Sequence, residues 1–161
     1  MDNFIPRSYY YEVEISGMKM TFSEVSGLQS ELVTEDLAVG GRNDHVFKLP
    51  VRVKHQNLVL KRAFNVSLKE DGQVEKTTGF YNDVISPLLH KEGNLDNKNI
   101  YNVCRIITIT LIDPDGTSLM SWTVNNAYPV KWQLSNLNAR ENTVAIESIE
   151  FAYLFLQMNI S

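Results

Sequence analysis

Three histidines and one cysteine are the side chains in this 161-residue chain that most readily ligate a soft metal, and the cysteine is also its most nucleophilic side chain. His45, His55 and His90 have no partner at i+2 or i+4, so their spacing predicts no metal site. One cysteine excludes an intramolecular disulfide framework and a cysteine-rich zinc site. Cys104 begins an apolar run, and no base is implied by spacing, so we expect a small buried hydrophobic residue.

Two loop motifs suggest anion or cation binding. Gly40-Gly41-Arg42 is glycine-rich, but it lacks the Lys-Ser/Thr pair and the strand-to-helix setting of a phosphate loop, which favours a surface loop. Asp113-Pro114-Asp115-Gly116 resembles the start of a calcium loop without its later bidentate glutamate, which favours a hairpin turn. No carboxylate pair is spaced for acid–base catalysis. We therefore expect a protein that is not an enzyme and has no cofactor or metal.

Charges are segregated within one stretch of the chain. The basic residues are Arg52, Lys54, His55, Lys61 and Arg62, and the acidic residues are Glu31, Glu35 and Asp36. Three interpretations stay open: a phosphate site, a solvated sheet face, or opposite patches that meet between subunits in a head-to-tail assembly. The net charge of −4 argues against a general nucleic-acid binder.

Alternation of apolar and polar residues predicts that strands make up most of the chain. The predicted strands are residues 9–15, 18–22, 28–35, 57–66, 104–112, 118–125 and 144–158. From Ile149 onward the last run is largely apolar on both faces, so a helix or another subunit must cover it. This feature favours the assembly interpretation over a monomer.

One helix is expected at about 78–90, because Phe80, Val84 and Leu88 recur at helical spacing and Thr78 can cap the start. Pro87 either interrupts this helix or begins a second short turn. Residues 34–44 and 91–102 are expected to be irregular. The sequence predicts a single domain over 1–161. Its expected fold is mainly β, an antiparallel β-sandwich or barrel with one short flanking α-helix.

The N-terminus lacks the pattern of a signal peptide, and no apolar run approaches the roughly 20 residues of a membrane helix. We therefore expect a soluble protein that is made in the cytoplasm. Stable nucleic-acid binding and membrane insertion are not expected.

Several motifs in one order resemble the tail tube protein family of contractile phages and phage-tail-like contractile injection systems. They are Glu24-Val25-Ser26-Gly27-Leu28, then Leu49-Pro50 through Lys54 to Asn57-Leu58-Val59-Leu60-Lys61-Arg62, then Ala127-Tyr128-Pro129-Val130-Lys131-Trp132, and Asn142-Thr143-Val144-Ala145-Ile146-Glu147. The resemblance spans about residues 9–153.

The resemblance implies hexameric rings that stack into a hollow tube, which a contracting sheath drives into a target. It implies as partners the chain itself, the sheath protein, baseplate or hub and terminator proteins, and cargo in the lumen. It also implies that an extended loop at about 34–50 reaches neighbouring subunits, and that the chain is assembled into a tail or injection particle that can be released from the cell. The candidate interface residues are Glu35, Gly40, Gly41, Arg42, Lys61 and Arg62. Arg62→Glu is expected to weaken assembly without unfolding the subunit, and Lys131 and Trp132 are expected to anchor a strand.

Other functions stay open at this stage. Within the same fold, the chain could be a baseplate-proximal tube component or an Hcp-like tube protein of type VI secretion. From another class, it could be a carbohydrate- or peptide-binding β-sandwich, which would need Tyr9, Tyr10 and Tyr11 as an exposed aromatic platform.

Overall fold

The computed structural model describes residues 8–38, 40–41, 46–64, 80–90, 104–135, 138, 140 and 145–160. All strand pairs among these residues are antiparallel. The strands are β1 (Tyr10–Ile15), β2 (Met18–Phe22), β3 (Glu24–Ser26), β4 (Ser30–Ala38), β5 (Val46–His55), β6 (Leu58–Ala63), β7 (Arg105–Ile112), β8 (Ser118–Leu134), β9 (Ile146–Ala152) and β10 (Phe155–Ile160), and the helix is η1 (Tyr81–His90).

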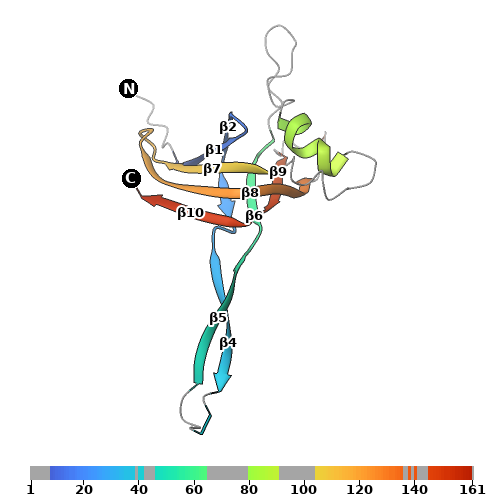
Figure 1. Ribbon diagram of the computed structural model, residues 1–161. Coiled ribbons are helices and arrows are strands. Elements are labelled where there is room, and N and C mark those ends of the chain that lie inside the picture. Colours follow the sequence, from blue (N-terminus) through green and yellow to red (C-terminus); the bar gives the residue numbers. More distant parts are fainter. Residues whose placement is uncertain are drawn as a thin grey trace.

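The long strand β8 joins two layers (Figure 1). Its first half pairs with β7 and β10, and β1 and β2 continue that first layer beyond β7. Its second half pairs with β9, and β6 and β3 continue the second layer. Asn126 lies between the two halves with φ of 54°, a conformation that asparagine tolerates better than most residues. The predicted mainly β antiparallel fold with one short helix is confirmed.

The core lies between the layers and is built from the inward positions of the alternating strands. The buried apolar side chains include Val13, Ile15, Ile107, Ile109 and Val124 from the first layer, Leu58, Leu60, Ile149 and Phe151 from the second, and Phe80, Val84 and Ile85 from the helical segment. The helix therefore closes one end of the core.

Two predicted turns are confirmed. Ser16 and Gly17 both have positive φ between β1 and β2, as a tight two-residue hairpin requires. Between β7 and β8, Oδ1 of Asp113 accepts hydrogen bonds from the amides of Asp115 at 2.9 Å and Thr117 at 2.8 Å. The Asp113 side chain thus stabilises the turn between β7 and β8.

The helix differs from the predicted α-helix in its hydrogen bonding. It is a π-helix from Tyr81 to His90, and it runs continuously through Pro87. Its i→i+5 bonding widens each turn, so Leu89, rather than the predicted Leu88, packs against the core. The proposed capping residue Thr78 and the 91–102 segment lie outside the described residues.

Two strand predictions were wrong. Residues 34–38 belong to β4 rather than to an irregular stretch, and β5, which pairs with it, was not predicted. The predicted strand 144–158 is two strands, because the chain leaves β9 at Ala152 and enters the other layer as β10 at Phe155. The apparent apolar character of both faces comes partly from this change of layer.

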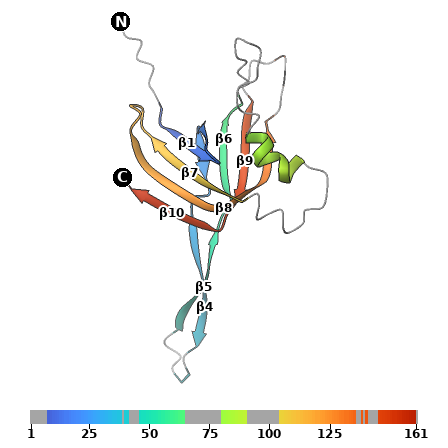
Figure 2. The same ribbon diagram turned by 45° about the horizontal axis from the view of Figure 1, so that its top comes forward.

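The β4–β5 pair forms a separate two-stranded sheet. It projects away from the layered body as a long ribbon, while both sheet layers and the helix lie on the other side of its base (Figures 1 and 2). The body holds the core, and the ribbon carries exposed side chains.

Candidate functional site

The β4–β5 hairpin is the first of two exposed apolar surfaces. A two-stranded ribbon is at best marginally stable alone in water, so apolar side chains along it indicate a partner. Phe47 is 61% exposed and lies opposite Leu37, which is also exposed. The other exposed large hydrophobic residues of the hairpin are Leu32, Val46, Leu49, Val51 and Val53.

The acidic residues of this hairpin lie on β4 and the basic residues on β5, and two pairs of them face each other. Glu31 lies directly opposite Lys54, and Asp36 lies directly opposite Lys48. Opposite charges at such positions stabilise strand pairing. Part of the segregation seen along the sequence is therefore a pairing of the two strands within one subunit, whereas Glu35 lies opposite Leu49 and Arg52 opposite Val33.

Strand β10 is the second exposed apolar surface. It pairs with β8 along one edge. Met158 and Ile160 point to the same side of the sheet as Leu156, which packs against the core. Nevertheless Met158 is exposed and Ile160 is 72% exposed, so the subunit's own described residues leave the far half of this strand uncovered.

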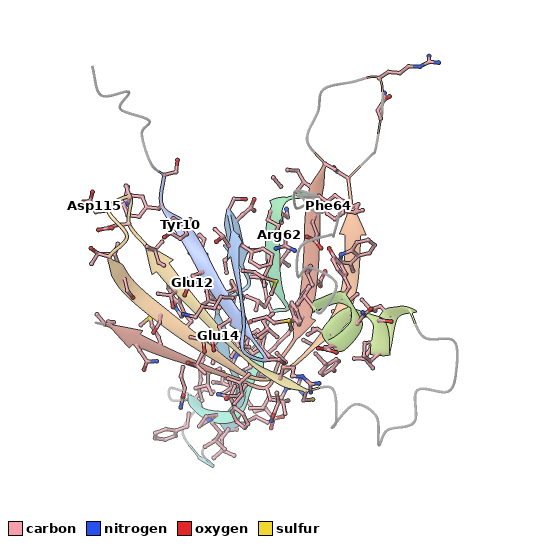
Figure 3. All side chains as sticks on the ribbon, turned by 90° about the horizontal axis from the view of Figure 1, so that it is seen from above. Tyr10, Glu12, Glu14, Arg62, Phe64 and Asp115 are labelled. Carbon is pink, nitrogen blue, oxygen red and sulfur yellow. The ribbon has the colours of Figure 1, made fainter. Side chains whose placement is uncertain are left out.

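The opposite face of the same layer is largely polar, although Ile106 and Phe155 are exposed on it. Glu12 and Glu14 extend along β1 on this face, as Figure 3 shows, and Nζ of Lys19 lies 3.4 Å from Oε1 of Glu12. Tyr10 shares this face, whereas Tyr11 packs against the core. The three tyrosines therefore do not form one aromatic platform, which removes the feature required for the carbohydrate-binding alternative.

The predicted interface residues lie in two separate places. Glu35 is exposed on β4 opposite Leu49. Gly40 and Gly41 lie in the turn segment beyond β4, and Gly41 has φ of +88°. Arg42 lies outside the described residues.

Lys61 and Arg62 lie on β6, in the body rather than on the hairpin. Lys61 is half-buried near Glu24, with 3.8 Å between Nζ and Oε1. Arg62 faces inward, and its Nε donates to Oε2 of Glu147 at 2.7 Å. The interface role of all six residues stays a prediction, but Arg62 already has an intramolecular role.

Sequence reasoning missed the buried carboxylate of Glu147, whose side chain is 0% exposed. Besides Arg62, it accepts hydrogen bonds from the Tyr81 hydroxyl and from Nε1 of Trp132 at 2.9 Å. Burial and the Glu147 carboxylate raise the pKa of Tyr81 to about 12. These four residues come from β6, η1, β8 and β9, so one buried charge links the helix to the second layer.

Other predictions about reactive side chains have mixed outcomes. Cys104 is half-buried, not buried, beside a hollow that Glu14 and Arg105 also line. Trp132 anchors its strand as expected, whereas Lys131 is exposed. Among the described residues, no group of three or more His, Cys, Asp or Glu side chains is placed to hold a metal ion. The part of the chain that the structure describes has no helix long and apolar enough to cross a membrane.

Solved structures with the same architecture include two contractile injection systems. A chain of the anti-feeding prophage baseplate is 22% identical with a TM-score of 0.65, over 96% of this chain and 94% of that one. A chain of the extracellular contractile injection system PVC, from its sheath–tube complex in the extended state, is 23% identical with a TM-score of 0.66, over 94% and 88%.

The fold is also that of Hcp1 from Salmonella typhimurium, at 9% identity and a TM-score of 0.54, over 95% of this chain and 87% of that one. No curated protein sequence matches the chain. The family model of the T4-like virus tail tube protein gp19 matches residues 7–157. A match over nearly the whole length shows that the protein belongs to this tail tube family, whose members are structural proteins and not enzymes.

Proposed function

We propose that the chain is the repeating subunit of the inner tube of a contractile injection system or phage tail. Hexameric rings of it stack into a hollow tube, which sheath contraction drives into a target and through which cargo passes. The observation that carries this proposal is the pair of exposed apolar surfaces, the β4–β5 hairpin and β10, in a member of a tail tube family.

The ring contact is proposed between the two edges of the first layer, β10 of one subunit and β2 of the next. The chemistry of the two edges matches. Met158 and Ile160 would continue the apolar side of the layer beside Met18 and Met20, and the polar sides would also meet. Such a head-to-tail contact closes into a ring when its rotation allows.

The stacking contact is proposed for the β4–β5 hairpin. Since it projects away from the body, it can reach a subunit that the ring contact does not touch (Figure 2). Its apolar residues Leu37 and Phe47 would be buried there. A stable assembly needs interfaces of about 1,000 Å² or more, which a ribbon inserted between neighbours supplies along both of its faces.

The proposed partners follow from the similar structures. Those structures comprise a sheath–tube complex, a sheath/tube terminator and a baseplate of contractile injection systems. We therefore propose that this chain also meets a sheath protein, a terminator and baseplate proteins, and that it is a component of an assembled tail or injection particle.

Sedimentation velocity tests the role of the hairpin. We expect the wild-type protein to form a hexamer and larger species as its concentration rises. The double variant Leu37→Ser/Phe47→Ser should keep the monomer fold, because both side chains are exposed, yet lose species larger than one ring. If this variant forms stacked species at wild-type concentrations, the hairpin is not the stacking contact.

A further inference from the structure

The base of the β4–β5 hairpin is a close contact between its two ends. Gly27 precedes β4 and Asn57 follows β5. Gly27 has φ of +87°, and a Cβ atom there would lie 1.9 Å from the carbonyl oxygen of Asn57. Only glycine therefore allows the two backbones to approach this closely. Nδ2 of Asn57 also donates to Oε1 of Glu150 at 2.8 Å, which ties this end to β9.

A buried tyrosine holds the same base. The hydroxyl of Tyr153 donates to the carbonyl oxygen of Gly27 at 2.9 Å and lies 3.3 Å from that of Gln29. Tyr153 is 8% exposed, and burial raises the pKa of its hydroxyl above the ordinary value for tyrosine. Both acceptors are backbone atoms of the segment that leads into β4, so this hydroxyl fixes main-chain positions.

His55 completes the contact from the last residue of β5. Its ring lies against the Tyr153 ring, with 4.9 Å between centroids and an angle of 37°. Its Nδ1 is 3.2 Å from Oγ of Ser30 and 3.3 Å from the carbonyl oxygen of Gln29. Tyr153 and His55 thus hold the two strands of the hairpin at the point where both leave the body.

We propose that Tyr153 and His55 are positioning residues that fix the direction in which the β4–β5 hairpin leaves the body. This inference rests on the proposed function, in which the hairpin binds a neighbouring subunit. A ribbon held in one direction loses less conformational freedom on assembly than a freely swinging one. The base of the hairpin, and not only its apolar side chains, therefore sets the strength of assembly.

The position of Tyr153 also links the two candidate assembly surfaces. It lies between β9 and β10, and the amide of the next residue, Leu154, donates to the carbonyl oxygen of Asn125 at 3.2 Å. β10 begins one residue later. The tyrosine that fixes the hairpin thus stands at the start of the strand proposed for the ring contact.

Spin-label distance measurements on the full chain test this proposal. Labels are attached at Asp36→Cys on β4 and Asp115→Cys in the β7–β8 turn, both exposed, after Cys104→Ser removes the native thiol. We compare wild-type Tyr153 with Tyr153→Phe, which keeps the ring beside His55 and removes the hydroxyl. The matched control is Tyr81→Phe, which removes a tyrosine hydroxyl from the Glu147 site, away from the hairpin.

In unassembled protein, we expect Tyr153→Phe to broaden the distance distribution and Tyr81→Phe to leave its width unchanged. The concentration needed for assembly should rise about fivefold in Tyr153→Phe, the change expected for one hydrogen bond. An unchanged width in Tyr153→Phe overturns the proposal. If Tyr153→Phe broadens the distance distribution but the wild-type protein never assembles, the positioning role is supported and the proposed tube function is refuted.

Discussion

Nε of Arg62 lies 2.7 Å from Oε2 of Glu147, a side chain that is completely buried. Arg62 itself is 19% exposed and stands over the Phe22 ring, 5.1 Å from its centroid. Figure 3 shows Arg62 on β6 among the strands of the body. A buried carboxylate is costly unless it is paired and hydrogen-bonded, so this contact supports the fold before any assembly occurs.

Removing the Arg62 guanidinium should therefore lower the stability of the folded subunit. Arg62→Ala leaves the buried Glu147 carboxylate without its cation, which should lower the free energy of unfolding by about 3 kcal/mol or more. The matched control is Lys61→Ala, since the neighbouring Lys61 is only half-buried and its partner Glu24 is exposed, and it should change stability by less than about 0.5 kcal/mol. Urea unfolding of both variants measures this. Equal, small losses of unfolding free energy in the two variants would show that Arg62 does not stabilise the buried Glu147 carboxylate. This expectation replaces the sequence-based one that Arg62→Glu leaves the fold intact.

Gly27 should not tolerate a side chain. In Gly27→Ala the new methyl group would meet the Asn57 carbonyl, and the positive φ adds strain, so we expect a loss well above about 1 kcal/mol. Gly17→Ala is the control, because Gly17 has φ of +77° with no atom within 4 Å of the added Cβ, and it should show the strain alone. Thermal unfolding of the two proteins separates the clash from the strain. Similar melting temperatures would contradict the close contact at the base of the hairpin.

Stability should fall at alkaline pH because of Tyr81. Its pKa is raised from 10.0 to about 12 in the folded protein, so the folded state holds this proton more tightly than the unfolded state. The stabilisation is complete below pH 10 and is lost as the pH rises through 12. Tyr81→Phe should remove this part of the pH dependence. Unfolding free energies of both proteins between pH 8 and 12 measure this contribution. Parallel curves would show that the pKa of Tyr81 is not raised in the folded protein.

A charge on the uncovered side of β10 should block ring formation. Met158 is exposed in the subunit, so Met158→Lys should leave the monomer folded and prevent burial of this side chain in an interface. Gln133→Lys places the same charge on an exposed position in the second half of β8, away from β10, and rings should still form. Size-exclusion chromatography distinguishes the two variants. Rings of normal size from Met158→Lys would exclude β10 as the ring contact.

Alternation along the sequence predicted the strands whose inner face belongs to this subunit's own core, such as β1, β2 and β7. β5 was missed although its residues alternate, with Phe47, Leu49, Val51 and Val53 on one face and Lys48, Pro50, Arg52 and Lys54 on the other. Pro50 within this run argues against a strand, because proline removes a ladder hydrogen bond. Alternation also missed the change of layer at Tyr153 and Leu154, where the inward phase shifts between β9 and β10.

The Glu147 site was predictable in part. Arg62 shares the inward phase of Leu58 and Leu60, and Glu147 shares that of Ile149 and Phe151. Two opposite charges at inward positions of different strands suggest a buried pair. The register that brings them together, with Tyr81 from the distant helix, depends on tertiary packing that a single sequence does not reveal.

Cryo-electron microscopy of the purified wild-type protein tests the central claim most directly. End-on views are predicted to show rings of six subunits around an open channel, and side views are predicted to show such rings stacked into tubes. A protein that stays strictly monomeric at high concentration, alone and together with its own baseplate proteins, would contradict the account.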